Sequence, residues 1–164
     1  MFAVGDVVMY GTQGVCKIHE VCTKKFGKTE SEYFLLRPYF DPKSVIYVPT
    51  DQDNLLSQMR EVLTRNEVND LIAEISSGKI EWIDNDNERQ DVCNEIIRSG
   101  DRVALMRLIQ MLYDRNEELK GQKKHFHIAD ERNLKRAEKL LHEEFAYVLG
   151  LQPADIPAYI SERL

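Results

Sequence analysis

Several features that mark common protein classes are missing from this chain of 164 residues. No run approaches the roughly 18–20 apolar residues that a membrane-spanning helix needs. The N-terminus, "MFAVGDVVMY", meets an aspartate before any secretory apolar region develops. Cys16, Cys22 and Cys93 form no CxxC pair, so we expect small core residues rather than disulfides or zinc ligands. These absences predict a cytoplasmic protein with no membrane partner.

The sequence also lacks the motifs of common active sites. No GxGxxG, P-loop, GxSxG, HExxH or EF-hand pattern occurs. His125 and His127 could share a metal, but no cysteine or carboxylate follows at ligand spacing, which favours solvated or helix-capping histidines. Asp84, Asp86 and Asp91 lack the glycine and terminal glutamate of a calcium loop. We therefore expect no enzyme, no cofactor, no metal and no small-molecule substrate.

Positive charge is in the minority. The chain carries 22 Lys and Arg against 28 Asp and Glu, a formal net charge of -6, whereas domains that coat nucleic acid are usually strongly basic. Basic residues gather only in "KGQKKHFHIADERNLKRAEKL". Any contact with DNA must therefore be confined to a small basic surface, or must depend on a partner that holds the protein near the DNA.

The first third of the chain has the pattern of short strands separated by turns. The strand candidates are "DVVMY", "VCKIHEVCT", "EYFLLRPYF" and "SVIYVP", with a fifth strand within "LLSQMREVL". Turn signals lie at Gly11 to Gly14, around Gly27 and at Asp41-Pro42. A spacing of about 8–12 residues between turns is typical of small barrels. We predict an SH3-like or Tudor-like five-stranded β-barrel over residues 1–63.

The pattern becomes helical at Thr64, where "TRNE" forms a capping box with Glu67. A first helix should end at Ser76-Ser77-Gly78, a second at Ser99-Gly100, and Asp101 should cap a third. A last helix should run from about residue 129 to 149 and stop at Gly150. The fold class is therefore α+β, with a compact α-helical domain over residues 64–164. The expected inner faces hold Val68, Leu71, Ile72, Ile75, Val92, Cys93, Ile96, Ile97, Leu105, Leu108, Ile109, Leu112, Leu134, Ala137, Leu141, Phe145 and Val148.

Two features of the helical part have both a structural and a functional interpretation. Arg132, Lys135, Arg136 and Lys139 lie three or four residues apart on one polar flank, which is either a solvated face or a phosphate-binding surface. Trp82 is the only tryptophan and lies among acidic residues in "IEWIDNDNERQD". It is either a core or interface anchor or an exposed ring that needs a partner.

The segments "VGDVVMYGTQGVCKIHEV", "EYFLLRPYF" and "IYVPTD" are followed by "IIRSGDRVALMRLIQMLYDRNEEL" and "DERNLKRAEKLLHEEFAYVLG". In this order they resemble the CarD/CdnL family of bacterial transcription regulators over nearly the whole chain. The resemblance implies a Tudor-like N-terminal domain that binds the β subunit of RNA polymerase. It also implies a helical domain that contacts promoter DNA, weakly and without sequence specificity, at the upstream edge of the transcription bubble.

The resemblance further implies site residues. The family's tryptophan wedges into the minor groove at the fork, a role that falls to Trp82. Such a wedge favours melted DNA because the closed duplex offers less contact, and tethering to polymerase raises the effective concentration of a weak DNA contact. The expected DNA contacts are Trp82, Arg89, Lys123, Lys124, Arg132, Lys135 and Arg136. The expected polymerase contacts are Lys24, Lys25, Phe26 and Tyr47.

Two positions depart from the family pattern. Residues 83–88 place mostly acidic positions between Trp82 and Arg89, and acid beside phosphate is unfavourable. Tyr47 occupies a position that is basic in some members. The leading hypothesis is a non-enzymatic regulator that modulates open-complex stability. The alternatives are an adaptor that docks on polymerase without engaging DNA, which the acidic stretch favours, and an enzyme that uses His125, His127 and nearby carboxylates.

Overall fold

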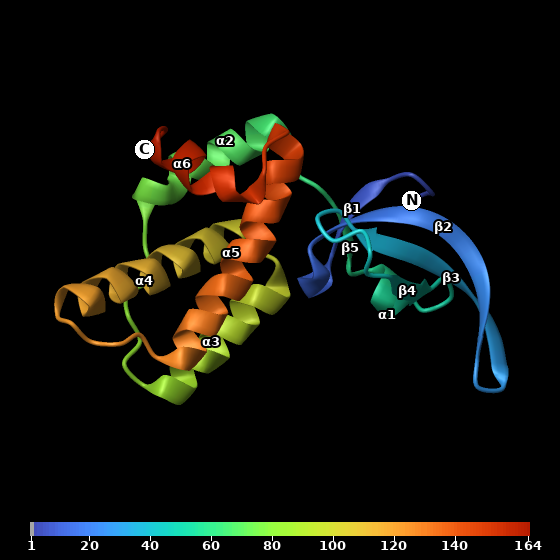
Figure 1. Ribbon diagram of the computed structural model, residues 1–164, viewed down its shortest axis with the longest axis horizontal. Coiled ribbons are helices and arrows are strands. Elements are labelled where there is room, and N and C mark those ends of the chain that lie inside the picture. Colours follow the sequence, from blue (N-terminus) through green and yellow to red (C-terminus); the bar gives the residue numbers. More distant parts are fainter. Residues whose placement is uncertain (1) are drawn as a thin grey trace. The chain divides into compact units, whose positions relative to one another are not determined.

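The computed structural model describes residues 2–164, and the chain folds as two compact units. One unit ends at Leu63 and the other comprises Thr64–Leu164. The first carries an antiparallel sheet and the second is helical (Figure 1). The fold class is α+β, as predicted.

The sheet of the N-terminal unit has five strands in the order β4-β3-β2-β1-β5. They are β1 (Val7–Tyr10), β2 (Val15–Phe26), β3 (Thr29–Pro38), β4 (Ile46–Pro49) and β5 (Met59–Glu61). A 3-10 turn, η1 (Gly11–Gln13), joins β1 to β2, and a single helical turn, α1 (Asp53–Leu56), precedes β5. The segment expected as a fifth strand is therefore helical at its start and extended only over its second half.

The sheet curves but does not close. Among the described residues, the edge strands β4 and β5 form no ladder with each other, so the five-stranded antiparallel sheet is confirmed and the closed barrel is not. The register shifts between Ile18 and Glu20, which leaves His19 as an extra residue in β2. A bulge bends its strand and increases the local twist, in agreement with the curvature of β2 in Figure 1.

Strands β2 and β3 form a long hairpin whose turn lies at Gly27. Phe26 pairs with Thr29 across a two-residue turn, and Gly27 has φ +67°. Type II′ hairpin turns require positive φ at this first central position, which suits glycine. The turn expected around Gly27 is confirmed. Lys24, Lys25 and Phe26 belong to the end of β2 rather than to the turn itself.

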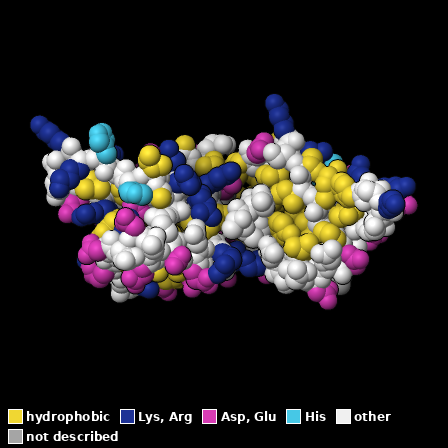
Figure 2. Space-filling view, turned by 90° about the horizontal axis from the view of Figure 1, so that it is seen from below, with side chains coloured by type: hydrophobic (Ala, Val, Ile, Leu, Met, Phe, Trp, Pro, Cys, Tyr) yellow, Lys and Arg dark blue, Asp and Glu magenta, His cyan; other side chains and the backbone are white. Residues whose placement is uncertain are grey.

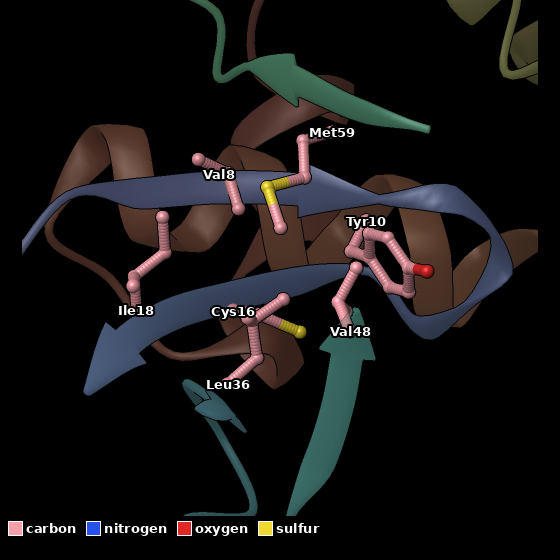
Figure 3. Close-up of a cluster of buried hydrophobic side chains, with 7 residues drawn as sticks. All are labelled: Val8, Tyr10, Cys16, Ile18, Leu36, Val48 and Met59. Atoms are coloured by element: carbon pink, nitrogen blue, oxygen red, sulfur yellow. The ribbon is translucent and has the colours of Figure 1, made fainter. Parts of the chain in front are cut away.

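A cluster of buried hydrophobic side chains of the N-terminal unit lies on one face of the sheet (Figure 3). Its buried members are Val8, Tyr10, Cys16, Ile18, Leu36, Val48 and Met59. Cys16 and, in the helical unit, Cys93 are buried as predicted, and no disulfide joins any of the three cysteines, all of which lie among the described residues. The prediction of a core position is wrong for Cys22, because it is only half-buried on the part of β2 that extends beyond the core.

The helical unit contains the expected helices and one short addition. Its elements are α2 (Arg65–Glu74), η2 (Ile75–Ser77), α3 (Asp86–Ser99), α4 (Arg102–Gly121), α5 (Ile128–Leu149), η3 (Pro153–Asp155) and α6 (Ile156–Ser161). The sequence did not predict α6. Within residues 2–164, no helix is both long and apolar enough to cross a membrane.

The predicted helix boundaries rest on real caps. Thr64 and Glu67 form the reciprocal capping box of α2. The Asp101 carboxylate accepts a hydrogen bond from the Ala104 amide at 3.1 Å at the start of α4. Gly150 ends α5 with φ +70°. These local signals fix where the helices begin and end.

Helix α5 contributes more buried residues than its neighbours. Leu134, Ala137, Leu141 and Phe145 are buried as predicted, whereas Val148 is only half-buried. The same helix buries two carboxylates, Asp130 and Glu144. Glu144 accepts two hydrogen bonds from the guanidinium of Arg102, at 2.7 and 3.0 Å. Asp130 belongs to the network described below.

Candidate functional site

Three aromatic rings meet near the end of the β2–β3 hairpin. The ring centroids of Phe26 and Tyr33 lie 5.3 Å apart, those of Phe26 and Tyr47 5.7 Å apart, and those of Tyr33 and Tyr47 6.0 Å apart, all edge to face. The strand register explains why the rings lie together. Tyr33 on β3 pairs with Cys22 on β2, and Tyr47 on β4 pairs with Leu35, two residues after Tyr33. Side chains two residues apart on a strand share a face, so Phe26 lies on the same face as Cys22.

This cluster is open to solvent. Phe26 is 52% exposed and Tyr47 is 36% exposed, and the Lys24 Nζ atom lies 6.0 Å from the centroid of the Tyr47 ring. Figure 2 shows hydrophobic side chains gathered on one face of the N-terminal unit. We call Lys24, Phe26, Tyr33 and Tyr47 the aromatic surface. Exposed apolar groups gathered in one place are typical of protein interaction sites.

The aromatic surface unites three of the four residues expected to contact polymerase. It holds Lys24, Phe26 and Tyr47, whereas the side chain of Lys25 projects from the opposite face because side chains alternate along a strand. Sequence reasoning missed Tyr33. The alternation in "SEYFLL" and the turn at Gly27 together would have placed Tyr33 opposite Cys22, on the same face as Phe26.

Trp82 lies in the connector between η2 and α3 and is half-buried. The Cζ atom of Arg89 lies 4.5 Å from the centroid of the tryptophan ring system, and that of Arg115 lies 5.1 Å away. The Nε atom of Arg115 is buried, with no hydrogen-bond partner among the described residues. We call Trp82, Arg89 and Arg115 the Trp82 clamp. The expectation of an unpartnered ring is therefore wrong, since the ring packs on two guanidinium groups.

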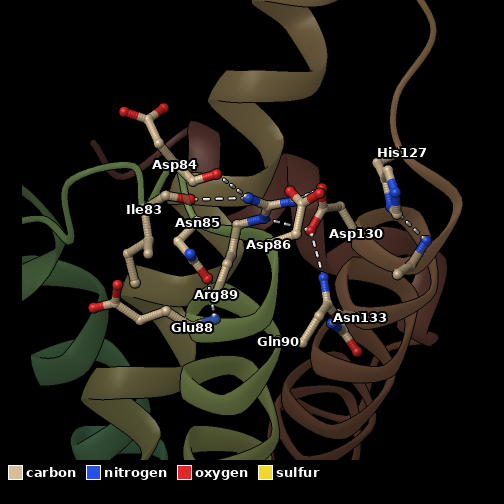
Figure 4. A network of polar contacts seen from close by, with 11 residues as sticks. Ile83, Asp84, Asn85, Asp86, Glu88, Arg89, Gln90, His127, Asp130 and Asn133 are labelled. Carbon is tan, nitrogen blue, oxygen red and sulfur yellow. Dashed lines mark hydrogen bonds and ion pairs between the residues drawn. The ribbon is translucent and has the colours of Figure 1, made fainter.

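Arg89 is the hub of a buried polar network (Figure 4). Its Nε atom donates to Asp130 Oδ1 at 2.8 Å, and its Nη2 atom donates to Asp130 Oδ2 at 3.0 Å and to Asp86 Oδ1 at 2.8 Å. Its Nη1 atom donates to the main-chain oxygen of Ile83 at 2.9 Å. The pKa of Arg89 is raised, mainly because its side chain donates hydrogen bonds to Asp130. Burial acts in the opposite direction but does not outweigh these bonds. The guanidinium thereby ties the connector that carries Trp82 to helix α5.

The same geometry argues against the predicted contact between Arg89 and DNA. The residue is only 3% exposed, and its donors are already bonded to carboxylate and carbonyl oxygens. A phosphate could reach it only by displacing these partners. Arg89 is instead a positioning residue for Trp82.

The acidic stretch after Trp82 spans the end of the connector and the start of α3, which begins at Asp86. The Asn85 side chain caps α3 by accepting a hydrogen bond from the Glu88 amide at 2.9 Å. Asp86 and Glu88 lie in the first helical turn, where negative charge suits the helix dipole. Asp86 and Glu88 thus have a structural role, and the side chains of Asp84 and Glu88 are exposed.

A second layer of contacts holds Asp130 in place. Gln90 Nε2 donates to Asp130 Oδ1 at 3.1 Å, and Asn133 Nδ2 donates to Gln90 Oε1 at 2.6 Å. Arg136 Nη1 then donates to Asn133 Oδ1 at 3.3 Å. The network therefore reaches from the buried pair to the surface of α5.

The remaining basic residues predicted to contact DNA are exposed. Arg132, Lys135 and Arg136 lie on α5, and Lys123 and Lys124 lie in the loop before it. Lys135 Nζ is 3.4 Å from Glu131 Oε1, and Arg136 Nη1 is 3.2 Å from Asn94 Oδ1. We call these five residues the basic flank. Figure 2 shows Lys, Arg and His side chains along one edge of the helical unit and acidic side chains along another.

His127 has a structural role as the N-cap of α5, where its Nδ1 atom accepts from the Ala129 amide at 3.3 Å. This agrees with the helix-capping interpretation of the histidine pair. In the part of the chain that the structure describes, no three His, Cys, Asp or Glu residues are grouped so that they could hold a metal ion.

Residues 2–63 match the family model of the CarD-like/TRCF RID domain. The match covers the five strands and the aromatic surface, and it ends where the helical unit begins. No curated protein matches the chain.

Proposed function

We propose that the protein is a transcription regulator of RNA polymerase, because its N-terminal unit matches the family model of the CarD-like/TRCF RID domain. The N-terminal unit docks on the β subunit, and the helical unit contacts promoter DNA at the upstream edge of the bubble, where it modulates the stability of the open complex. The family match carries the polymerase half of this proposal. No catalytic step is part of it.

The aromatic surface supplies a suitable docking face. Phe26 and Tyr47 offer exposed apolar area next to a positive charge at Lys24, and aromatic residues are enriched where interfaces concentrate their binding energy. A partner with an apolar patch flanked by a carboxylate would complement it. We place the polymerase contact on this face of β2, β3 and β4.

The DNA half of the proposal is supported by the basic flank and by Trp82. The flank presents exposed lysines and arginines on one helix and the loop before it, which suits phosphate contacts that position a protein without reading bases. A chain with net charge -6 does not hold DNA by bulk electrostatics. Polymerase tethering would supply the effective concentration that such a weak contact needs.

Trp82 can stabilise melted DNA only if its ring reaches the fork. In the structure the ring contacts guanidinium groups instead of bases. Of the two arginines in the clamp, Arg115 has the more exposed side chain, at 33% against 3%, and it is the one that a DNA phosphate could draw away. An exposed base would then replace a guanidinium on the ring, exchanging one contact with the aromatic face for another.

The second candidate function is an adaptor that docks on polymerase without engaging DNA. Three observations favour it, namely the burial of Arg89, the half-burial of Trp82 and the exposure of Asp84 and Glu88, which follow Trp82 in the chain. It shares the polymerase contact with the leading proposal and differs only in what the helical unit does.

Reversing the charge of Lys24 should slow association with polymerase by about tenfold at low salt, since charges beside an interface act mainly on the association rate. Lys25→Glu is a matched control, because the neighbouring side chain projects from the opposite face of the strand. Association can be followed by biolayer interferometry, and thermal melting should be nearly unchanged in both variants because exposed charges contribute little to folding. Equal association rates for the two variants would move the interface away from the aromatic surface.

Replacing Lys135 and Arg136 by alanine should flatten the salt dependence of DNA engagement. Each phosphate contact contributes about one unit to the slope of log K against log salt, so two lost contacts should lower it by about two. The loss should be similar for different DNA sequences. Arg98→Ala with Arg163→Ala removes the same charge elsewhere on the helical unit and should keep the slope. If the first variant keeps it too, the flank is only a solvated face.

A further inference from the structure

The helical unit contains a pocket of about 340 Å³ between η2, α4, α5 and α6. Its apolar wall includes Ile75, Met106, Ile109, Leu141 and Ile160. The volume falls within the range of about 300–1,000 Å³ that is typical of small-molecule sites. Neither Trp82, nor its two arginines, nor the basic flank lines this pocket, so it is a separate feature of the unit.

Among the described residues, the polar side chains that line the pocket include a carboxyl group but no lysine or arginine. Glu138 and His142 lie one turn apart on α5, and Gln110 and Tyr113 face them from α4. Burial raises the pKa of Glu138 and lowers that of His142. The lining therefore presents the partly buried carboxyl group of Glu138 one helical turn from the partly buried imidazole of His142.

We propose that this pocket binds a small amphiphilic cation, with an ammonium group at the Glu138 carboxylate and an aryl or alkyl body against the apolar wall. Burial in the pocket removes part of the hydration of the Glu138 carboxylate. The ammonium group would compensate for this loss with a charge-assisted hydrogen bond. Tyr113, which is 50% exposed, also lines the pocket and adds an aromatic ring, a group that attracts cations.

The lining distinguishes this ligand class from the two alternatives of similar size. A neutral apolar ligand would fill the wall but would desolvate Glu138 further without replacing its lost hydration. An anionic ligand would meet the carboxylate with no basic side chain to offset the repulsion. The proposal does not depend on whether the protein engages polymerase or DNA.

Three probes of matched size separate these possibilities, namely phenethylamine, phenethyl alcohol and hydrocinnamate. Each is titrated into the full-length chain, and binding is located by the methyl NMR signals of Met106, Ile109 and Ile160. We expect the amine to bind about tenfold more tightly than the alcohol, which is the gain typical of a hydrogen bond to a charged group. Hydrocinnamate should bind most weakly.

The charge preference should depend on Glu138 alone. Glu138→Gln keeps the shape of the side chain and should reduce affinity for the amine to that for the alcohol, with the alcohol unaffected. Glu131→Gln is the matched control, since it removes an exposed carboxylate from the same helix outside the pocket, and it should keep the tenfold preference. Equal binding of amine and alcohol to the wild-type chain would overturn the proposal. So would a preference that survives Glu138→Gln, the absence of binding, or shifts confined to methyl groups outside the pocket.

Discussion

Replacing Arg89 by methionine should lower the free energy of unfolding of the helical unit by about 3–5 kcal/mol, which is the usual cost of removing one partner from a buried ion pair. Methionine fills similar space but leaves the Asp130 carboxylate, which is 1% exposed, without its bidentate partner. It also frees the main-chain oxygen of Ile83 and removes one cation from Trp82. Urea unfolding measures the loss, and the fluorescence of Trp82, the only tryptophan, reports on this unit alone.

Arg98→Met provides the matched control. Arg98 forms an exposed ion pair with Glu95 on the same helix, so its loss should cost no more than about 0.5 kcal/mol. Adding Asp130→Leu to Arg89→Met should recover part of the stability, because no unpaired charge is then buried. If Arg89→Met cost less than about 1 kcal/mol, the network would not be what holds the connector of Trp82 in place.

Replacing Trp82 by alanine should shorten the lifetime of the open promoter complex by a factor that corresponds to about 1–3 kcal/mol, the usual value of a contact between a base and an aromatic ring. The helical unit should lose only about 1–2 kcal/mol of stability, since the ring is half-buried and makes two cation–π contacts. Binding to polymerase should be unchanged, because we propose that the N-terminal unit makes that contact. The lifetime is measured by adding a polyanionic competitor to preformed complexes.

Two further variants test whether the tryptophan acts as a wedge. Trp82→Phe keeps an aromatic face and should retain much of the lifetime. Tyr113→Ala removes another exposed ring of the same unit and should leave the lifetime unchanged. If Trp82→Ala instead destabilised the unit by about 3–5 kcal/mol, as loss of a core anchor does, with the lifetime unaltered, the ring would be structural and the adaptor would become the better account.

The local parts of the fold could be predicted from sequence because their causes are local. The capping box at Thr64, the cap at Asp101 and the stop at Gly150 each act within a few residues, so sequence spacing reveals them. Closure of a barrel depends on two edge strands that are far apart in the sequence. Five strands were predicted and five are present, although the fifth covers only part of its predicted segment. Nothing in their composition showed that β4 and β5 would not pair with each other among the described residues.

The candidate sites show the same limit. Arg89 follows several acids and looks exposed in the sequence, yet it is buried because Asp130, 41 residues later, lies against it. Asp86, three residues before Arg89, was the only local sign of an ion pair. The aromatic surface could be only partly predicted. The turn at Gly27 sets the pairing of Tyr33 with Cys22, but the bulge at His19 places Cys22 on the face opposite Ile18, which even spacing along β2 would not suggest.

The most direct test of the proposed function is the lifetime of open complexes formed by the cognate polymerase, measured with and without a saturating amount of the full-length protein. Co-sedimentation in the same samples establishes that the protein is bound. The account predicts that bound protein lengthens the lifetime, because contacts that form only with melted DNA slow the collapse of the bubble. An unchanged lifetime in the presence of bound protein would contradict it.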